Sequence, residues 1–302
     1  MPFKARTVPV GLIMLRILHK RMNFSGEEKK YYVYQEKGFA GEVQFDLLTD
    51  KLQSECYILN DLLLKVNNTT FQIDTSIIFQ KTLHFFEVKN YEGDYCFRNG
   101  RFETLNEKEI KNSLDQVKRI TSLLRQLLQK LGYHHLTIEG KVVFINPRFT
   151  LYQAPLNEPI IYPTQVDALM ETLNVKLSKL TNQDKKLAEQ LVSLHQKESS
   201  FIQIPTYNYE QLKKGITCRE CGSFLMSVLG MNVVCSDCGC NEIVESAVLR
   251  IVDEIKLLFP DQKITTNVVH EWCVVIKSKK RISRILERNF KMVGVRNWTY
   301  YE

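Results

Sequence analysis

Two acids and a lysine have the types and spacing best suited to chemistry. Asp74 lies on one strand-like run, and Glu87 and Lys89 lie on the next. The runs meet at Gln80–Lys81, and a hairpin centred on that bond places Asp74 directly opposite Glu87, with Lys89 on the same face. Like charges that face each other across two strands are destabilising. The pair therefore calls for a neutralising cation or a shared proton.

A divalent cation suits two carboxylates best. Mg²⁺ or Mn²⁺ accepts carboxylate oxygens and completes its shell with water and phosphate oxygens. Lys89 would then orient or deprotonate a bound water, or neutralise charge that builds on a phosphate. This arrangement is typical of a phosphodiester hydrolase. The alternative is structural: Glu87 and Lys89 form a solvated strand face, and Asp74 pairs with a lysine.

The elements that must position these residues follow the order helix, three strands, helix, strand. Hydrophobic periodicity predicts a helix over Glu42–Leu52, strands over Tyr57–Val66, Thr70–Phe79 and Thr82–Tyr91, a helix over Glu107–Leu131 and a strand over Val142–Asn146. The last strand is a continuous apolar run, which is typical of a strand covered on both faces. The sequence therefore predicts an α/β fold with an αβββαβ core.

Four cysteines form a second chemical pattern, the two pairs Cys218–x–x–Cys221 and Cys235–x–x–Cys238. This spacing is typical of a four-cysteine Zn²⁺ site, and four thiolates leave no open coordination position. The predicted zinc is therefore structural, with a hairpin around Gly230 between the pairs. Disulfides are the alternative, and Cys240 is an alternative ligand to Cys238.

The positive charge of the chain is concentrated at its C-terminal end. Residues 263–302 hold nine Lys and Arg against three Asp and Glu, out of a net charge of +7 for the whole chain. Four of these cations recur at spacings of four, three and four residues: Lys277, Arg281, Arg284 and Arg288. Such a stripe can follow nucleic-acid phosphates, and a preceding short helix suggests a winged or helix-turn-helix arrangement. The alternative is a solvated face.

Four prolines between Pro147 and Pro163 mark the first domain boundary. We expect four parts: the αβββαβ domain with an N-terminal helical extension over 1–163, a helical linker over 164–214, a zinc ribbon over 215–241, and a basic helical domain that binds nucleic acid over 242–302.

The composition excludes several classes of protein. With 302 residues, 44% hydrophobic and 25% charged, the chain is neither collagen-like nor fully disordered. No apolar run approaches the ~18–20 residues of a membrane span. A phosphate-binding loop of the GxxxxGK[ST] type is absent, which argues against an ATPase. We expect a cytoplasmic protein without a cleaved targeting peptide.

Several segments resemble the nuclease-related domain (NERD) family, a branch of the PD-(D/E)XK nuclease superfamily. They are Gly38–Glu42, Phe71–Asp74, Phe86–Gly93, Asn112–Gln116 and Val143–Pro147. The resemblance covers roughly residues 30–150 and implies a restriction-endonuclease-like core. One departure is Ile73, which stands where the superfamily has the proline of its Pro-Asp pair. With its zinc module and basic end, the whole chain is similar to the longer NERD proteins of Bacillus-type bacteria.

The resemblance implies a role for each matching residue. Asp74 and Glu87 would bind the divalent ion, and Lys89 would activate the attacking water. Glu42 would be an additional acid that helps to hold the metal. Gln116 would position the substrate or the lysine.

The function expected from these features is Mg²⁺- or Mn²⁺-dependent cleavage of DNA, with the zinc and basic regions holding the substrate. Two alternatives remain open: a non-catalytic DNA-binding or regulatory protein on a nuclease-derived fold, and an RNA-processing nuclease.

Overall fold

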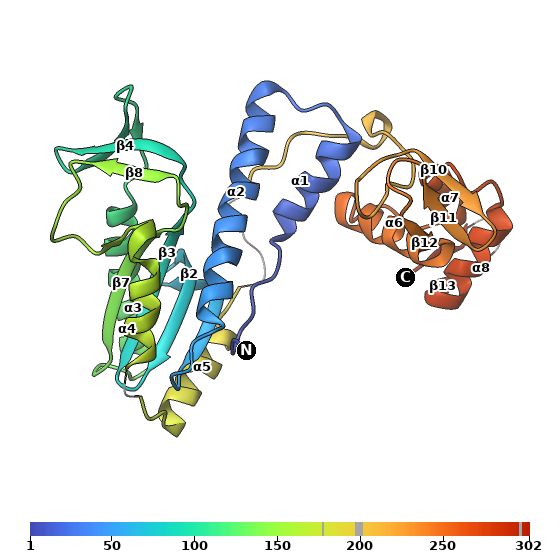
Figure 1. Cartoon of the computed structure of the whole chain (residues 1–302). Coiled ribbons are helices and arrows are strands. Elements are labelled where there is room, and N and C mark those ends of the chain that lie inside the picture. The colour runs from blue at the N-terminus through green and yellow to red at the C-terminus, as the bar shows by residue number, and fades with distance from the viewer. Residues whose placement is uncertain (177, 197–201, 296–297) are drawn as a thin grey trace. The chain divides into compact units, whose positions relative to one another are not determined.

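The computed structural model describes residues 1–176, 178–196, 202–295 and 298–302 (Figure 1). The chain divides into two compact units. The first unit comprises Met1–Val10 and Tyr31–Phe201, and the second comprises Gly11–Lys30 and Ile202–Glu302. Within the described residues, no helix is both long enough and apolar enough to cross a membrane.

The first unit is built around a five-stranded sheet of order β1-β2-β3-β7-β9. Its strands are β1 (Tyr57–Val66), β2 (Thr69–Phe79), β3 (Thr82–Lys89), β7 (Thr137–Phe144) and β9 (Ile160–Ile161). The first three strands are antiparallel, β7 runs parallel to β3, and β9 runs parallel to β7. Thr75 pairs with Phe86, so the register of the β2–β3 hairpin is the one expected from a turn at Gln80–Lys81.

Helices cover both faces of this sheet. On one face, α3 (Ser113–Lys130) and α5 (Asn182–Ser193) share a core with β1, β2, β3 and β7. On the other face, Phe45 of α2 (Gly26–Thr49) joins Phe86 of β3 and residues of α4 (Val166–Asn174), which follows a short 3₁₀ turn at Pro163–Gln165. Phe85 and Phe86 point to opposite faces because side chains alternate along a strand. The predicted α/β core is therefore confirmed.

A small four-stranded sheet, which the sequence did not predict, follows β3. It has the order β6-β5-β4-β8 and comprises β4 (Gly93–Arg98), β5 (Arg101–Thr104), β6 (Glu109–Ile110) and β8 (Phe149–Tyr152) (Figure 1). It replaces the first turns of the helix expected from Glu107. The helix α3 begins at Ser113 because the Asn112 side chain caps it, accepting a hydrogen bond from the Leu114 N–H.

The second unit holds the cysteines and the basic C-terminal end around one core. Its helices are α1 (Val10–Arg21), α6 (Val244–Leu258), α7 (Thr266–Cys273) and α8 (Lys279–Asn289), with a 3₁₀ turn at Tyr209–Gln211. A three-stranded sheet contains β10 (Met226–Leu229), β11 (Asn232–Cys235) and β12 (Asn241–Ile243), and a two-stranded sheet contains β13 (Met292–Val293) and β14 (Tyr300–Tyr301).

The compact units do not coincide with the four parts expected from the sequence. Cys235 of the cysteine module and Ile285 of the basic end belong to the same buried cluster, so 215–241 and 242–302 share one core. Leu18 of the N-terminal helix joins that cluster as well. The segment expected as a linker is divided: Leu187 packs in the core of the first unit, and Leu212 packs in the core of the second.

Candidate active site

Asp74 lies where the ladder between β1 and β2 is interrupted. Pairing runs from Tyr57 to Asn60 and resumes at Leu62, so that Asp61 and Asp74 are left out. Asp61 adopts a left-handed backbone conformation with φ of 55°. The buried Asp74 side chain turns to β3, where its Oδ2 accepts a hydrogen bond of 2.8 Å from the Val88 N–H. The carboxylate is thus fixed at the end of the β2–β3 ladder.

Glu87, Lys89 and Gln116 meet beside it. The Lys89 ammonium donates to Glu87 Oε1 at 2.6 Å and to Gln116 Oε1 at 3.4 Å. Glu87 is 2% exposed, and its other oxygen, Oε2, is buried without a hydrogen-bond partner among the described residues. An unpartnered carboxylate oxygen in the interior is costly unless a cation or a proton occupies the space that it faces.

The carboxylates at this site hold their protons more tightly than usual. Burial, together with the neighbouring charge of Asp74, raises the pKa of Glu87 to about 7. Burial also raises the pKa of Asp74, against the opposing influence of Lys89 and Arg6. Burial acts to lower the pKa of Lys89, but the charges of Glu87 and Asp74 outweigh it and raise that pKa above its usual range. Lys89 is therefore an ammonium near neutral pH.

Glu42 lies on α2 and is paired with an arginine. The Arg6 guanidinium donates to Glu42 Oε2 at 2.5 Å and to Asp46 Oδ2 at 2.7 Å. Burial, reinforced by the charge of Asp74, raises the pKa of Glu42 to about 8. Arg6 therefore binds one oxygen of Glu42, the acid that the resemblance implies helps to hold the metal.

Sequence reasoning missed both Arg6 and Asp46. Asp46 had a usable signal, since it follows Glu42 by four residues and must share its helix face. Arg6 had none, because it reaches the site from a segment 36 residues before Glu42.

A close contact sets α2 against the end of β3. Gly41 directly precedes Glu42, and a Cβ at Gly41 would lie 2.5 Å from the Asn90 Cβ. The Asn90 amide donates to the Lys37 carbonyl at 2.7 Å and accepts from the Asn146 amide at 2.9 Å. The absence of a side chain at Gly41 therefore allows Glu42 to approach the strand that carries Glu87 and Lys89.

The residues fit a hard divalent cation. Asp74 and Glu87 supply two buried carboxylates, and no group in the described part of the chain hydrogen-bonds to Glu87 Oε2. Across the described ranges, the acids of this site form no group of three whose ligand oxygens all lie within 4.8 Å of one another. A site with two carboxylate ligands is typical of Mg²⁺, which keeps several water ligands and binds few protein groups.

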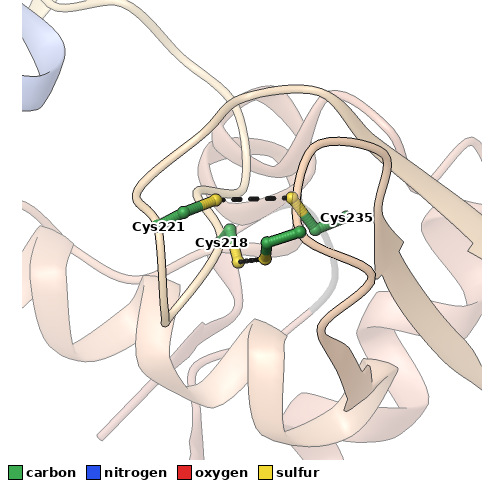
Figure 2. A group of neighbouring side chains, drawn as sticks. Cys218, Cys221 and Cys235 are labelled. Carbon is green, nitrogen blue, oxygen red and sulfur yellow. Dashed lines mark hydrogen bonds between the residues drawn. The ribbon is translucent and has the colours of Figure 1, made fainter.

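The four predicted cysteines come together in the second unit, on tight turns beside β10 and β11. Their sulfur atoms all lie within 4.8 Å of one another. The sulfur atoms of Cys218 and Cys238 are separated by 3.5 Å. Those of Cys221 and Cys235 are separated by 3.6 Å (Figure 2). Tetrahedral zinc with Zn–S bonds of about 2.3 Å requires sulfur separations of about 3.8 Å. The donor set therefore fits a closed structural zinc site, and Cys240 is not part of the group.

The predicted cationic stripe is only partly available to a ligand. Arg281 donates to the Gly230 carbonyl at 2.9 Å, and Arg288 forms an ion pair of 3.3 Å with Glu245. Lys277 and Arg284 are exposed. Lys277 lies before the helix rather than on it, because Ser278 is the N-cap of α8.

A family model matches the part of the chain that carries the acidic site. Residues 37–145 match the family model of the nuclease-related domain (NERD). This range contains Glu42, Asp74, Glu87, Lys89 and Gln116. No curated protein and no solved structure matches the chain.

Proposed function

Because residues 37–145 match the model of the nuclease-related domain, we propose that this protein is a divalent-metal-dependent nuclease that hydrolyses phosphodiester bonds in DNA. The observation that carries the proposal is the buried Oε2 of Glu87, beside Asp74 and the Lys89 ammonium. This oxygen has no hydrogen-bond partner in the ranges that the structure describes. A site with two acids, one of them incompletely bonded, and one buried cation is suited to a metal and a phosphate.

In this proposal Asp74 and Glu87 bind Mg²⁺ or Mn²⁺. When bound, the ion supplies Lewis-acid polarisation of a phosphate oxygen and lowers the pKa of a coordinated water. Lys89 is held by Glu87 and Gln116, and its raised pKa favours the charged form. It would therefore donate to a phosphate oxygen and neutralise developing charge, rather than remove a proton. Glu42 is given no ligand role here, because Arg6 engages its Oε2.

We further propose that the second unit grips the nucleic acid. Its four cysteines would hold a structural Zn²⁺, and the exposed Arg284 and Lys277 would contact phosphates with Arg281 and Arg288 close by. Four thiols brought together for a metal, rather than for disulfides, favour a cytoplasmic location.

The test is a cleavage assay on DNA and RNA with Mg²⁺ or Mn²⁺. Asp74→Ala and Lys89→Met are compared with Lys65→Met, an exposed lysine of β1 that serves as the matched control. We expect wild type and control to cut DNA equally and both site variants to lose at least about 100-fold in rate, the scale of one electrostatic donor. Equal rates in all four proteins contradict the assigned roles, and cleavage of RNA alone contradicts the substrate.

A second candidate is a non-catalytic DNA-binding protein on the same fold, which the exposed cations near α8 favour. It predicts DNA retention without cleavage, unaffected by chelation of Mg²⁺, with affinity that falls steeply as salt rises.

A further inference from the structure

The segment before α1 lies along the edge of the central sheet in the first unit. The Phe3 N–H donates to the Ile58 carbonyl at 2.8 Å, and the Asn60 N–H donates to the Lys4 carbonyl at 2.9 Å. The Lys4 ammonium donates to the carbonyls of Asn60 and Asp61, each at 2.7 Å. These hydrogen bonds satisfy backbone N–H and C=O groups beside the interrupted β1–β2 ladder. They also place the next basic residue, Arg6, at the acidic site.

Arg6 is almost completely buried among acids. Its side chain is 4% exposed, and beyond the bonds to Glu42 and Asp46 it donates to the Asp74 carbonyl at 2.7 Å. That carbonyl belongs to the residue which drops out of the β1–β2 ladder. One guanidinium thus contacts two carboxylates of α2 and the backbone of a proposed metal ligand, in a forked geometry that a lysine cannot reproduce.

When all of its acids are ionised, the site carries the net charge that one divalent ion balances. Glu42, Asp46, Asp74 and Glu87 contribute four negative charges when ionised, and Arg6 and Lys89 contribute two positive ones. A net charge of −2 remains within this group. Two further charges lie nearby. Asp61, whose charge also acts on Glu42 and Asp74, lies beside the Lys4 cation. Lys111, whose charge acts on Glu87, is exposed to screening water.

Resting on the proposed function, we propose that Arg6 occupies the position of a second divalent cation, so that the site takes one ion through Asp74 and Glu87. Glu42 and Asp46 are then partners of Arg6 and not metal ligands. Four residues apart on α2, they present two carboxylates on one face, beside the Asp74 carbonyl. Without the guanidinium, these oxygens form the donor set that a hard cation prefers.

The experiment counts bound Mn²⁺ by titration calorimetry and by the electron paramagnetic resonance signal of the free ion. We expect one ion in wild type and two in Arg6→Met. The second ion is lost when Glu42→Gln and Asp46→Asn are added. Arg101→Met, which removes an exposed arginine in β5, is the matched control and retains one ion.

The outcomes separate this inference from the proposed function. Suppose that wild type binds one ion, that Glu87→Gln abolishes this binding, and that Arg6→Met still binds one ion. This result overturns the role of Arg6 and leaves the proposed function intact. No ion in wild type overturns both.

Circular dichroism shows whether Arg6→Met folds, and Glu42→Gln in the wild-type background gives an independent test. We expect one ion in this variant, with an affinity within about threefold of wild type. A tenfold or greater loss of affinity contradicts the inference, because it makes Glu42 a ligand.

Discussion

Replacing Glu87 by glutamine is expected to stabilise the metal-free protein at alkaline pH. Burial and Asp74 raise the pKa of Glu87 from its ordinary 4.5 to about 7. A carboxyl whose pKa is higher in the folded state gives stability that is complete below pH 4.5 and is lost as the pH rises to about 7. Each pKa unit corresponds to about 1.36 kcal/mol, so the charged form costs about 3 kcal/mol above pH 7. Glutamine is uncharged and avoids this cost.

Thermal unfolding in a chelator at pH 8 and at pH 4 measures the effect. At about 2–4 °C per kcal/mol for a domain of this size, Glu87→Gln is expected to raise Tm by roughly 6–12 °C at pH 8 and by almost nothing at pH 4. Glu189→Gln, an exposed glutamate of α5, is the matched control and should leave Tm unchanged at both. An equal or lower Tm for Glu87→Gln at pH 8 refutes the reasoning.

Adding Mg²⁺ at 100 times its Kd should nearly cancel the difference in stability between the two proteins at pH 8. An ion at 100 times its Kd stabilises the protein that binds it by about 2.7 kcal/mol. Wild type at pH 8 should gain this stabilisation, and Glu87→Gln should gain none, because it lacks the charged ligand. An equal gain in both proteins would place the ion elsewhere.

Three further perturbations test the surroundings of the site and the second unit. Gly41→Ala should destabilise the protein by about 1–3 kcal/mol in urea unfolding, because the new Cβ would meet Asn90. Gly38→Ala, whose Cβ would have open space around it, should be neutral or slightly stabilising. Equal effects of the two substitutions would contradict the packing argument. Cys235→Ser should reduce the zinc content, measured by mass spectrometry, below one ion per chain and should broaden the unfolding transition of the second unit. An unchanged zinc content would contradict the zinc site. Arg284→Ala should weaken DNA binding and reduce the slope of log affinity against log salt by about 1, and an unchanged slope would remove this arginine from the interface.

Local patterns predicted much of the first unit. The turn at Gln80–Lys81 placed β2 and β3 in the observed register, because a two-residue connection leaves one symmetric pairing. Alternation within β3 placed Glu87 and Lys89 on one face, where they form a direct contact. The paired cysteines came together as expected, since each pair needs only one tight turn.

Features that depend on long-range contacts were not accessible from local patterns. Arg6 is brought to Glu42 by pairing of the N-terminal segment with β1, and nothing in the neighbourhood of either residue signals it. The interruption at Asp61 changes which side chains face each core. Hydrophobic periodicity does not predict it, because a residue in the left-handed backbone region does not alter the pattern of apolar residues in the sequence. The strands β5 and β6 span four and two residues, which is too short for alternation to be recognised.

The central claim, that Asp74 and Glu87 hold a divalent ion beside Lys89, is tested most directly by a crystal structure of the protein soaked in Mn²⁺, with diffraction collected at the manganese absorption edge. We predict one anomalous peak within about 2.5 Å of an oxygen of each carboxylate, with Glu87 Oε2 as a ligand. A peak elsewhere, or a site in which the two carboxylates share a proton and exclude the ion, would contradict the account.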